Sequence, residues 1–434
     1  MANTKSIGTL GRRSCFPGAM PLWLLASCMA AALALSAENR TNAAAAFKPD
    51  FEPNLPVLLL TANGPIDKVQ KTPCALGMMI PGEPRPGASN SWAGVVKLHG
   101  GVSAGFPKRS FAITLASPTR LLDLRESAHW VLNAVFIDRS LMRHKLSYDL
   151  FRSLDARDAR RFAVGSRFVE VYFNGDYHGV YLLMERVDGA LLGLRRFASN
   201  DVSHASIYKA VDHAANFSQP GHAGYEQREP DALVKEYWQP LDEFNRFASR
   251  ARDAEFLEPQ TGIGSRLDLD NAIDFYLLVL LTSNLDGITK NFMIARDVSR
   301  EGSPRPRFFF VPWDYDGTFG RNWDASAVAP DVWLSNHLFD RLMGDRAFRD
   351  RLTKRWKALR EREFSAKTIQ AMIETNVRTL GDAVRRNTAR WRSTVGHYPD
   401  RLSFGEDAAQ MKTWIEARIQ WLDEEFKRRA AAAP

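Results

Sequence analysis

The residues best suited to chemistry in this chain lie in two short segments, N-L-D-G-I-T-K-N-F (284–292) and P-W-D-Y-D-G-T-F-G (312–320). The first contains Asp286 and Asn291, and the second contains Asp314 and Asp316. Carboxylate and amide oxygens are good ligands for Mg²⁺. A carboxylate can also orient a hydroxyl group or accept its proton. An Asp, a nearby Asn and then an Asp-rich turn that ends in glycine is the order found in phosphoryl-transfer centres.

The elements that flank these segments are expected to hold the four side chains in place. Residues 270–281 are apolar on nearly every face, which predicts a fully buried helix before Asp286. Residues 308–313 (F-F-F-V-P-W) predict a buried strand that places Asp314 and Asp316 at alternate positions. A helix-capping Asp and a turn Asn are common without any function, so Asp286 and Asn291 alone decide nothing. Two carboxylates delivered by a buried strand need a cation to offset their desolvation, and Mg²⁺ bound to ATP is a natural one.

Three further residues are candidates for binding a nucleotide. Glycines in the loop 99–108 could bring backbone N–H groups close to phosphates, and Lys108 at its end could neutralise them, although an exposed loop lysine is the simpler interpretation. Lys209, in I-Y-K-A, is a second candidate cation. Glu185 ends an apolar strand that could lead into a hinge contacting adenine, or it could form a salt bridge. Arg143 and Asp149, on a predicted helix, could contact Lys108 or the phosphates.

The pattern of elements predicts an α+β, bilobal fold. Residues 55–189 read as a strand-rich first lobe, with a hairpin across Asn174-Gly175, whereas residues 190–430 read as a helical second lobe. Residues 72–91 are rich in Pro, Gly and Ser and are expected to form a loop that contains Cys74. Amphipathic stripes predict helices over 338–359, with a break near Gly344, and over 411–426.

The start of the chain predicts export. Residues 1–37 combine a basic beginning with an apolar run and small residues suited to signal-peptidase cleavage. The same segment could instead stay as a membrane anchor, or be lipidated at Cys28 in L-A-S-C. Residues 38–54 read as a tether. The location expected is therefore periplasmic, cell-envelope or extracellular.

The charged, His and Cys residues of the chain restrict which classes of molecule it is expected to bind. The chain has 434 residues, with 58 Lys and Arg against 50 Asp and Glu. Positively and negatively charged residues alternate along the predicted helices. Alternating signs are typical of solvated helix faces, so no nucleic-acid partner is expected. The scattered histidines and the three cysteines have no zinc-ligand spacing. After Cys15 and Cys28 in the leader, only Cys74 remains, so no intrachain disulfide is expected in the mature chain.

Five segments in order resemble the CotH kinase family, which is named for a spore coat protein. They are G-G-V-S-A-G-F-P-K-R-S-F (100–111), W-V-L-N-A-V-F-I-D-R-S-L-M-R (130–143), V-Y-F-N-G-D-Y-H-G-V-Y-L-L-M-E-R-V-D (171–188) and the two segments described first. The chain departs from the family at His99-Gly100-Gly101, where Arg-Gly-Asn is usual, and residues 300–307 read as a longer hairpin loop.

The resemblance implies an atypical protein-kinase fold that uses ATP with Mg²⁺ or Mn²⁺ to phosphorylate Ser or Thr of secreted or cell-surface proteins. It implies Asp286 as the catalytic residue and Asn291 and Asp314 as metal ligands, with Asp316 as the alternative ligand. Lys108 is the implied phosphate contact. Two other functions stay open: another ATP reaction on the same fold, such as AMP transfer or ligation, and a surface or adhesion protein without catalysis.

Overall fold

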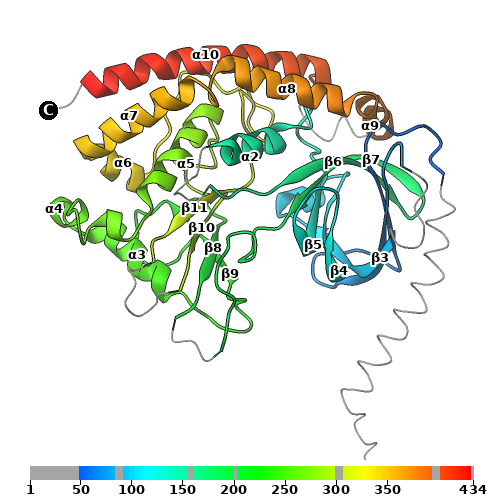
Figure 1. Cartoon of the computed structure of the whole chain (residues 1–434), viewed down its shortest axis with the longest axis horizontal. Helices are drawn as coiled ribbons and strands as arrows, with labels where there is room; N and C mark the ends of the chain where they lie inside the picture. The colour runs from blue at the N-terminus through cyan, green and yellow to red at the C-terminus, as the bar shows by residue number, and fades with distance from the viewer. Residues whose placement is uncertain are drawn as a thin grey trace, which may run out of the picture.

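The computed structural model describes residues 48–83, 91–154, 161–199, 203–298, 306–392 and 401–431. Within these ranges the protein is a mixed α+β structure. Strands form a barrel in the first part of the chain, and helices surround a smaller sheet in the second part (Figure 1). The expected order, strands before helices, is confirmed. The predicted leader, residues 1–37, and most of the tether lie outside the described ranges.

Seven strands make the barrel, in the spatial order β1-β2-β3-β4-β5-β7-β6. Their bounds are β1 Val57–Ala62, β2 Thr72–Met79, β3 Ser91–His99, β4 Ser110–Arg120, β5 Glu126–Asn133, β6 Ser166–Phe173 and β7 Asp176–Glu185. Every neighbouring pair is antiparallel except β1 and β6, which run parallel and close the barrel. The β6–β7 hairpin turns at Asn174 and Gly175, both with positive φ, as predicted.

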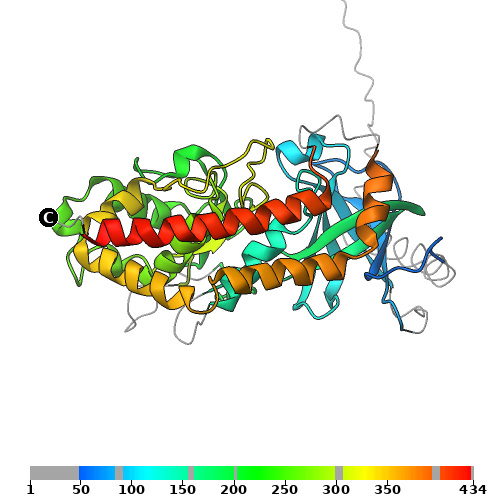
Figure 2. The same cartoon turned by 90° about the horizontal axis from the view of Figure 1, so that it is seen from above.

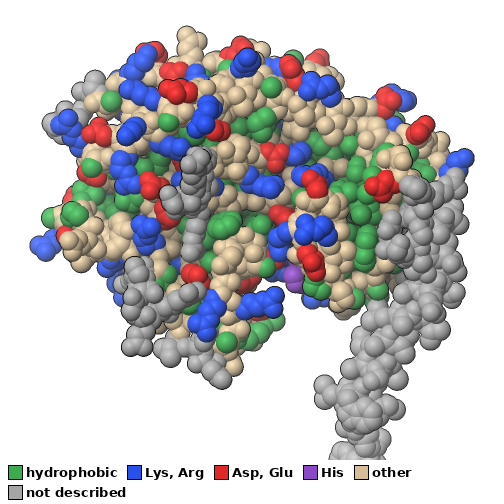
Figure 3. All heavy atoms as spheres, viewed as in Figure 1, with side chains coloured by type: hydrophobic (Ala, Val, Ile, Leu, Met, Phe, Trp, Pro, Cys, Tyr) green, Lys and Arg blue, Asp and Glu red, His purple; other side chains and the backbone are tan. Residues whose placement is uncertain are grey.

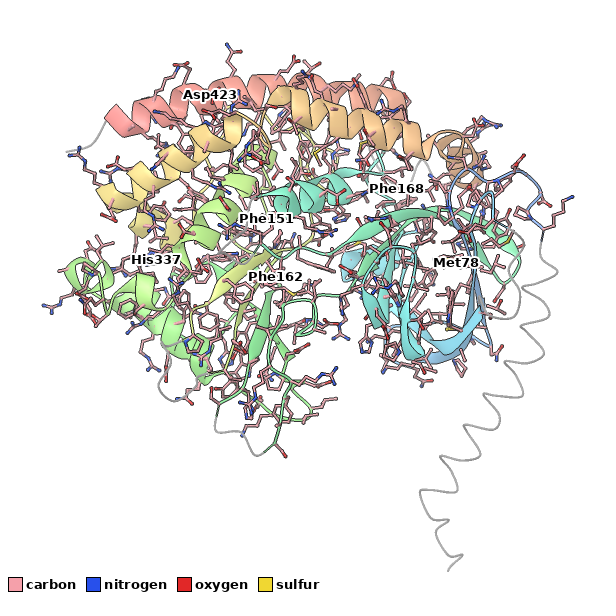
Figure 4. All side chains as sticks on the ribbon, in the orientation of Figure 1. Met78, Phe151, Phe162, Phe168, His337 and Asp423 are labelled. Atoms are coloured by element: carbon pink, nitrogen blue, oxygen red, sulfur yellow. The ribbon has the colours of Figure 1, made fainter. Side chains whose placement is uncertain are left out.

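Strand β2 corrects the expectation of a loop over 72–91. Its inward side chains, Cys74, Leu76 and Met78, belong to the core of the barrel, and Figure 4 shows Met78 inside it. The alternation was hidden because the outward positions are Pro, Ala and Gly, which do not read as polar. Cys74 is therefore a buried free cysteine in a strand and not a loop residue.

The second part contains a four-stranded sheet in the order β11-β10-β8-β9. Its strands are β8 Ser206–Ala210, β9 Tyr225–Glu229, β10 Phe292–Arg296 and β11 Phe309–Pro312. We call this sheet and the helices around it the helical part. The β10–β11 pair was expected, but β9 was not. It is five residues long and three of its residues are charged, so no apolar run marks it.

Helices cover this sheet and connect it to the barrel. Their bounds are α2 Arg143–Ser153, α3 Gln239–Arg250, α4 Asp253–Phe256, α5 Leu269–Thr282, α6 His337–Gly344, α7 Arg346–Arg360, α8 Ala366–Leu380, α9 Ala383–Trp391 and α10 Phe404–Ala431, with short 3₁₀ turns η2 Val102–Gly105, η3 His213–Ala215 and η4 Ile263–Ser265. The predicted break near Gly344 separates α6 from α7. Helix α10 runs along the top of the molecule beside α8 (Figures 1 and 2).

Two helices cross between the barrel and the helical part. Helix α2 lies between β5 and β6 in sequence but packs on α5, so its Phe151 shares one apolar core with Phe168 of β6 and with α5 (Figure 4). Helix α9 comes late in the chain but packs on β7 of the barrel (Figure 1). These crossings hold the two parts against each other.

Helix α5 sets the position of the first chemistry-bearing segment. Its residues 271–282 are all buried, as predicted. Asp268 caps its N-terminus by accepting from the Asn271 N–H, and Ser283 ends it in the left-handed region, at φ 50°. The turn at Ser283 directs the chain into residues 284–291. Among the helices of the described ranges, none combines the length and apolarity that crossing a membrane requires.

Candidate active site

The two chemistry-bearing segments form adjacent loops, which we call the Asp286 loop (residues 284–291) and the Asp314 loop (residues 313–320). Three hydrogen bonds join them or their flanking residues. The Asn284 side-chain amide donates to the Asp314 carbonyl (3.3 Å), and the Trp313 N–H donates to the Asn291 carbonyl (3.3 Å). The Phe319 N–H donates to the Thr282 carbonyl at the end of α5 (2.9 Å). The pairing of β10 with β11 therefore brings both loops to one end of the sheet.

Asp314 and Asp316 bring their carboxylates together, as the alternation along the chain predicted. Oxygens of both, and a ring nitrogen of His144, lie within 4.8 Å of one another. Burial, and then the charge of Asp314, raise the pKa of Asp316 well above its ordinary value. Two facing carboxylates of this kind need a cation to stay ionised, and oxygen ligands suit Mg²⁺ or Mn²⁺. The pair therefore fits a divalent metal.

His144 of α2 belongs to this cluster and turns its Nε2 towards Asp314. Its Nδ1 accepts from the Tyr315 backbone N–H (3.0 Å), so in the neutral ring the proton is on Nε2. Burial lowers the pKa of His144, which favours that neutral ring. Nε2 lies 3.8 Å from Asp314 Oδ1. A protonated Nε2 cannot coordinate a metal, so in this tautomer Asp314 and Asp316 would be the ligands of a metal ion.

A tyrosine on the same helix supports the backbone of the Asp314 loop. The Tyr148 hydroxyl accepts from the Asp314 N–H (3.0 Å). Asp314 has a positive φ of 59°, which is unfavourable for a residue with a side chain. The bonds from His144 and Tyr148 offset that strain. Helix α2 therefore fixes the direction in which the two carboxylates point.

Asp286 lies at the edge of the cluster with two basic neighbours. Its Oδ2 is 3.2 Å from the Lys290 Nζ, and its Oδ1 is 3.7 Å from the His213 Nε2. His213, from η3, also shares a hydrogen bond with the Thr289 hydroxyl (2.7 Å). The charge of Asp286 contributes to the raised pKa of Asp316, so the three carboxylates act on one another. Asp286 is partly exposed and can meet an incoming hydroxyl.

Asn291 lies between the two loops, with its backbone fixed on both sides. Its N–H donates to the Ala210 carbonyl (3.1 Å), and its carbonyl accepts from Trp313. Its φ of 59° marks a second left-handed residue in the site. The backbone of Asn291 is thus adjacent to the Asp314 loop, and its role as a metal ligand stays a prediction.

Of the two lysines predicted to bind phosphates, Lys209 is the one that the structure places near Asp314. Its Nζ lies 5.7 Å from the centre of the Trp313 ring. Burial lowers the pKa of Lys209, and the charge of Asp314 opposes that effect. His99, at the end of β3, lies against the same ring, with centroids 6.4 Å apart. Burial, and then Lys209, lower the pKa of His99 to about 4. Lys209 and His99 therefore flank Asp314 where the barrel faces the helical part.

Lys108 and Glu185 have their described contacts elsewhere. The Lys108 Nζ is buried and donates to the Val180 carbonyl and to Asn387 Oδ1 of α9 (3.0 Å). The Glu185 carboxylate accepts from the backbone N–H groups of Arg125 (3.0 Å) and Gly165 (2.6 Å). The backbone N–H of Glu185 donates to the Gly165 carbonyl. The structure thus does not bring either side chain to the carboxylate cluster.

Arg143 and Asp149 also differ from the expected contacts with Lys108 or phosphates. Arg143 is buried and forms ion pairs with Asp138 and Asp407, at 2.6 Å each. Asp149 pairs with Lys145 on the surface of α2 (2.6 Å). Neither forms a described contact with Lys108. The second segment of the resemblance, 130–143, therefore contributes structure around the site through Arg143.

Sequence reasoning did not single out several polar residues of the site, His99, His144, His213 and Asn284 among them. The three histidines come from elements distant in sequence from the two loops, and no spacing rule connects them. Asn284 was visible inside N-L-D-G. A Cβ on Gly287 would lie 2.5 Å from the Asn284 side chain, so the glycine makes room for that amide. The Asn-x-x-Gly spacing was the one available signal.

The surface is hollowed between the barrel and the lower end of the β8–β9 pair (Figure 3). Lys, Arg, Asp and Glu are mixed over the visible face, in agreement with their alternation in the sequence. A separate cavity of about 380 Å³ lies against α3, and its lining includes Phe247, Arg266 and Arg296. Strand β10 follows Asn291 and ends at Arg296, so this cavity is one strand length away from the candidate site.

Comparison with known proteins shows which family the chain belongs to. The family model described as CotH kinase protein matches residues 96–422, three-quarters of the chain and all of the site. The chain belongs to the CotH kinase family. It is similar to the inner spore coat protein H of Bacillus subtilis (strain 168), with 28% identity over 287 residues, which cover 64% of this chain and 73% of that protein. The resemblance seen in the five segments is confirmed.

Proposed function

We propose that this protein is an atypical protein kinase that transfers the γ-phosphoryl group of ATP to a Ser or Thr hydroxyl of a secreted or cell-surface protein. The observation that supports it most is the pairing of the Asp314 and Asp316 carboxylates, with Asp286 and Lys209 near enough for their charges to act on them. Membership of the CotH kinase family supports the same reaction class. In this proposal the barrel and the helical part are the two lobes of a kinase-like fold.

The role proposed for each residue follows from its place in the site. Asp314, with Asp316 and Asn291, would hold a divalent metal, and Lys209 would bind the phosphates of ATP. Bound Mg²⁺ or Mn²⁺ would supply positive charge to the phosphates during transfer. Asp286 orients the acceptor hydroxyl and receives its proton, while Lys290 and His213 hold the carboxylate in place. Positioning and electrostatics account for nearly all of the rate enhancement in this class of reaction.

We propose further that the enzyme acts outside the cytoplasm. The basic and apolar character of residues 1–37 supports this location, either with a cleaved leader or with the segment kept as an anchor. A protein substrate would then be a secreted or surface protein that meets the enzyme in the same compartment.

The test uses purified protein with a mixture of candidate surface proteins and ATP labelled at either the α or the γ phosphate, in Mg²⁺ or Mn²⁺. We expect label to pass to protein from γ-labelled ATP only. Transfer from α-labelled ATP would replace the kinase proposal with AMP transfer. ATP cleavage without labelled protein would favour ligation, and no nucleotide binding at all would favour a surface protein without catalysis.

A further inference from the structure

A single buried arginine connects the Asp314 loop to two other elements. The Arg143 Nε donates to the Thr318 carbonyl (2.9 Å), two residues beyond Asp316. Its two terminal nitrogens donate to both carboxylate oxygens of Asp407, at 2.6 Å each, near the start of α10. One of them also donates to Asp138 (2.6 Å). The side chains of Asp138 and Asp407 are fully buried, and that of Arg143 is 2% exposed.

Helix α10 also packs directly against the end of the Asp314 loop. Gly320 has a φ of 88°, and a Cβ at this position would lie 2.5 Å from Gln410 Nε2 and 2.6 Å from the Trp414 ring. The Trp414 indole N–H donates to the Val328 carbonyl (2.7 Å), and the Val328 N–H donates to the Gly320 carbonyl (3.0 Å). The loop therefore ends on a surface that α10 provides.

A second arginine connects α10 to the residues that lead into the Asp286 loop. The Arg418 Nε donates to the Leu280 carbonyl (2.8 Å) in the last turn of α5, and its NH1 donates to the carbonyls of Pro330 (2.7 Å) and Val332 (2.6 Å). A cation at the carbonyl end of a helix is favourable. Ser283 and the Asp286 loop follow directly, so Arg418 fixes the point from which that loop departs.

A contribution to stability alone does not explain why Arg143, Asp138 and Asp407 form a buried charged group. Buried ion pairs contribute no more stability than well-packed apolar residues of similar volume in many proteins. The guanidinium does provide a rigid fork whose donors are fixed in direction. Such a fork is suited to holding two elements at a set distance and angle.

We propose that α10 aligns the two loops of the active site. In this arrangement the Asp407–Arg143 pair holds the Asp314 loop through the Thr318 carbonyl, and Arg418 holds the start of the Asp286 loop through the Leu280 carbonyl. Arg143, Asp407 and Arg418 are then positioning residues, because they touch the loop backbones and not the reacting atoms. The inference rests on the proposed kinase function for its catalytic consequence.

The first test uses Arg143→Lys, which keeps the charge but not the fork, and Asp407→Asn, which keeps the shape. Loss of a hydrogen bond to a charged group predicts Mg²⁺–ATP binding about tenfold weaker in both. Hydrogen exchange in the nucleotide-free protein gives a second readout, and we expect the amides of residues 317–319 to exchange faster in both variants. Calorimetric titration and exchange mass spectrometry measure the two effects.

Arg355→Met is the control. Arg355 forms a bidentate pair in the helical part with Asp274, whose side chain is also fully buried and pairs with Arg161 as well. Its loss should lower the melting temperature and leave both readouts unchanged. Folded Arg143→Lys and Asp407→Asn proteins with exchange at residues 317–319 equal to that of the parent would overturn the inference, and so would the same change in Arg355→Met.

The second test separates the two loops. A lysine at position 418 can donate to fewer of the three backbone carbonyls that Arg418 binds. Arg418→Lys should therefore lower the rate of phosphoryl transfer about tenfold, while the affinity for Mg²⁺–ATP changes less than about twofold. An equal loss of affinity would contradict the separate role of Arg418. If the parent protein itself does not bind Mg²⁺–ATP, the proposed function fails, whereas the exchange comparison in nucleotide-free protein still decides the alignment.

Discussion

Asp314 and Asp316 are neighbours with different surroundings. The Asp314 side chain is 42% exposed and faces His144, whereas Asp316 is less accessible and has a raised pKa because of burial and the charge of Asp314. The more exposed carboxylate is the better placed of the two to take a metal from solution. This difference supports Asp314 as the main metal ligand.

We therefore predict that Asp314→Asn abolishes transfer and strongly weakens Mg²⁺-dependent ATP binding, because an amide has no charge to hold the ion. Asp286→Asn should retain nucleotide binding and lose transfer, since that carboxylate meets the hydroxyl. Asp316→Asn should be milder than Asp314→Asn. Titration calorimetry on the three folded variants measures this. Near-normal affinity and turnover in Asp314→Asn would make Asp316 the metal ligand instead.

Substitution of the two candidate lysines should have different effects: one on the affinity for ATP and the other on stability. Lys209→Met should raise the Kd for Mg²⁺–ATP more than about tenfold with little change in melting temperature, since Lys209 lies beside Asp314. Lys108→Met should instead lower stability by about 1–3 kcal/mol, because it removes the lysine donor from the buried Val180 carbonyl and one of two donors from Asn387 Oδ1. Thermal melts and ATP titrations of both variants check this. A larger affinity loss in Lys108→Met would restore Lys108 as the phosphate contact.

At the residue scale, the sequence singled out the side chains that are proposed to perform chemistry and missed those that support them. Asp286, Asn291, Asp314 and Asp316 can be recognised from their local spacing. His144 and Tyr148 cannot, because each acts on a backbone N–H of residues 314–315 from a helix that is far away in sequence. Lys108 was predicted to contact phosphates because a lysine that follows a glycine loop is expected to be exposed. In the structure β7 and α9 bury it.

At the scale of elements, helix α9 is attached to the barrel through polar contacts. Asn387 accepts from both Lys108 and the Val180 N–H (3.1 Å), and the Trp391 indole donates to the His178 carbonyl (2.9 Å). Gly179 has a φ of 92°, and a Cβ there would lie 2.4 Å from Asn387. The glycine therefore permits the close approach of α9 to β7.

His178 makes this attachment sensitive to pH. Burial, then Arg390 and Lys108, lower the pKa of His178 to about 4, against an ordinary value of 6.5. The unfolded chain thus binds the proton first, and folding stability is fully present above pH 6.5 and declines as the pH falls towards 4. We predict that His178→Phe, in thermal melts between about pH 7 and pH 4.5, loses less stability on acidification than the parent. An equal or steeper decline would contradict this.

Long, strongly apolar elements were predictable, and short ones were not. Helices α5 and α10 show their apolar stripes in sequence because each must bury a long face. Strands β2 and β9 could not be recognised, since small or charged residues occupy their outer positions. The placement of α9 was beyond sequence reasoning because its partner strand precedes it by about two hundred residues, and only the folded structure brings them together.

For the whole molecule, the start of the folded region is fixed to the barrel. Phe51 contacts the rings of Tyr172 and Tyr177, with centroids 6.3 Å and 5.3 Å away, and Arg386 lies over its ring. These contacts begin after residue 47, so the predicted leader is not needed for them. The folded body should tolerate the loss of residues 1–37.

We predict that mass spectrometry of the protein from its native cell finds an N-terminus close to Glu38, or finds the full chain in the membrane fraction. A shortened chain that starts at Glu38 should melt within about 2 °C of the native protein, because the Phe51 contacts remain. Recovery of the full-length chain, with Met1 intact, from the soluble cytoplasm would exclude export.

The parallel pairing of β1 with β6 has a consequence for how the chain is made. Val57 pairs with Glu170, so the first strand waits for more than a hundred further residues before its second neighbour exists. At usual rates of translation, about 5–20 residues per second, the gap lasts roughly 5–20 seconds. During that time β1 has an unpaired edge of Val and Leu residues, the kind of surface that holdase chaperones cover. The order of the strands thus leaves this edge of β1 without its second neighbour until β6 has been synthesised.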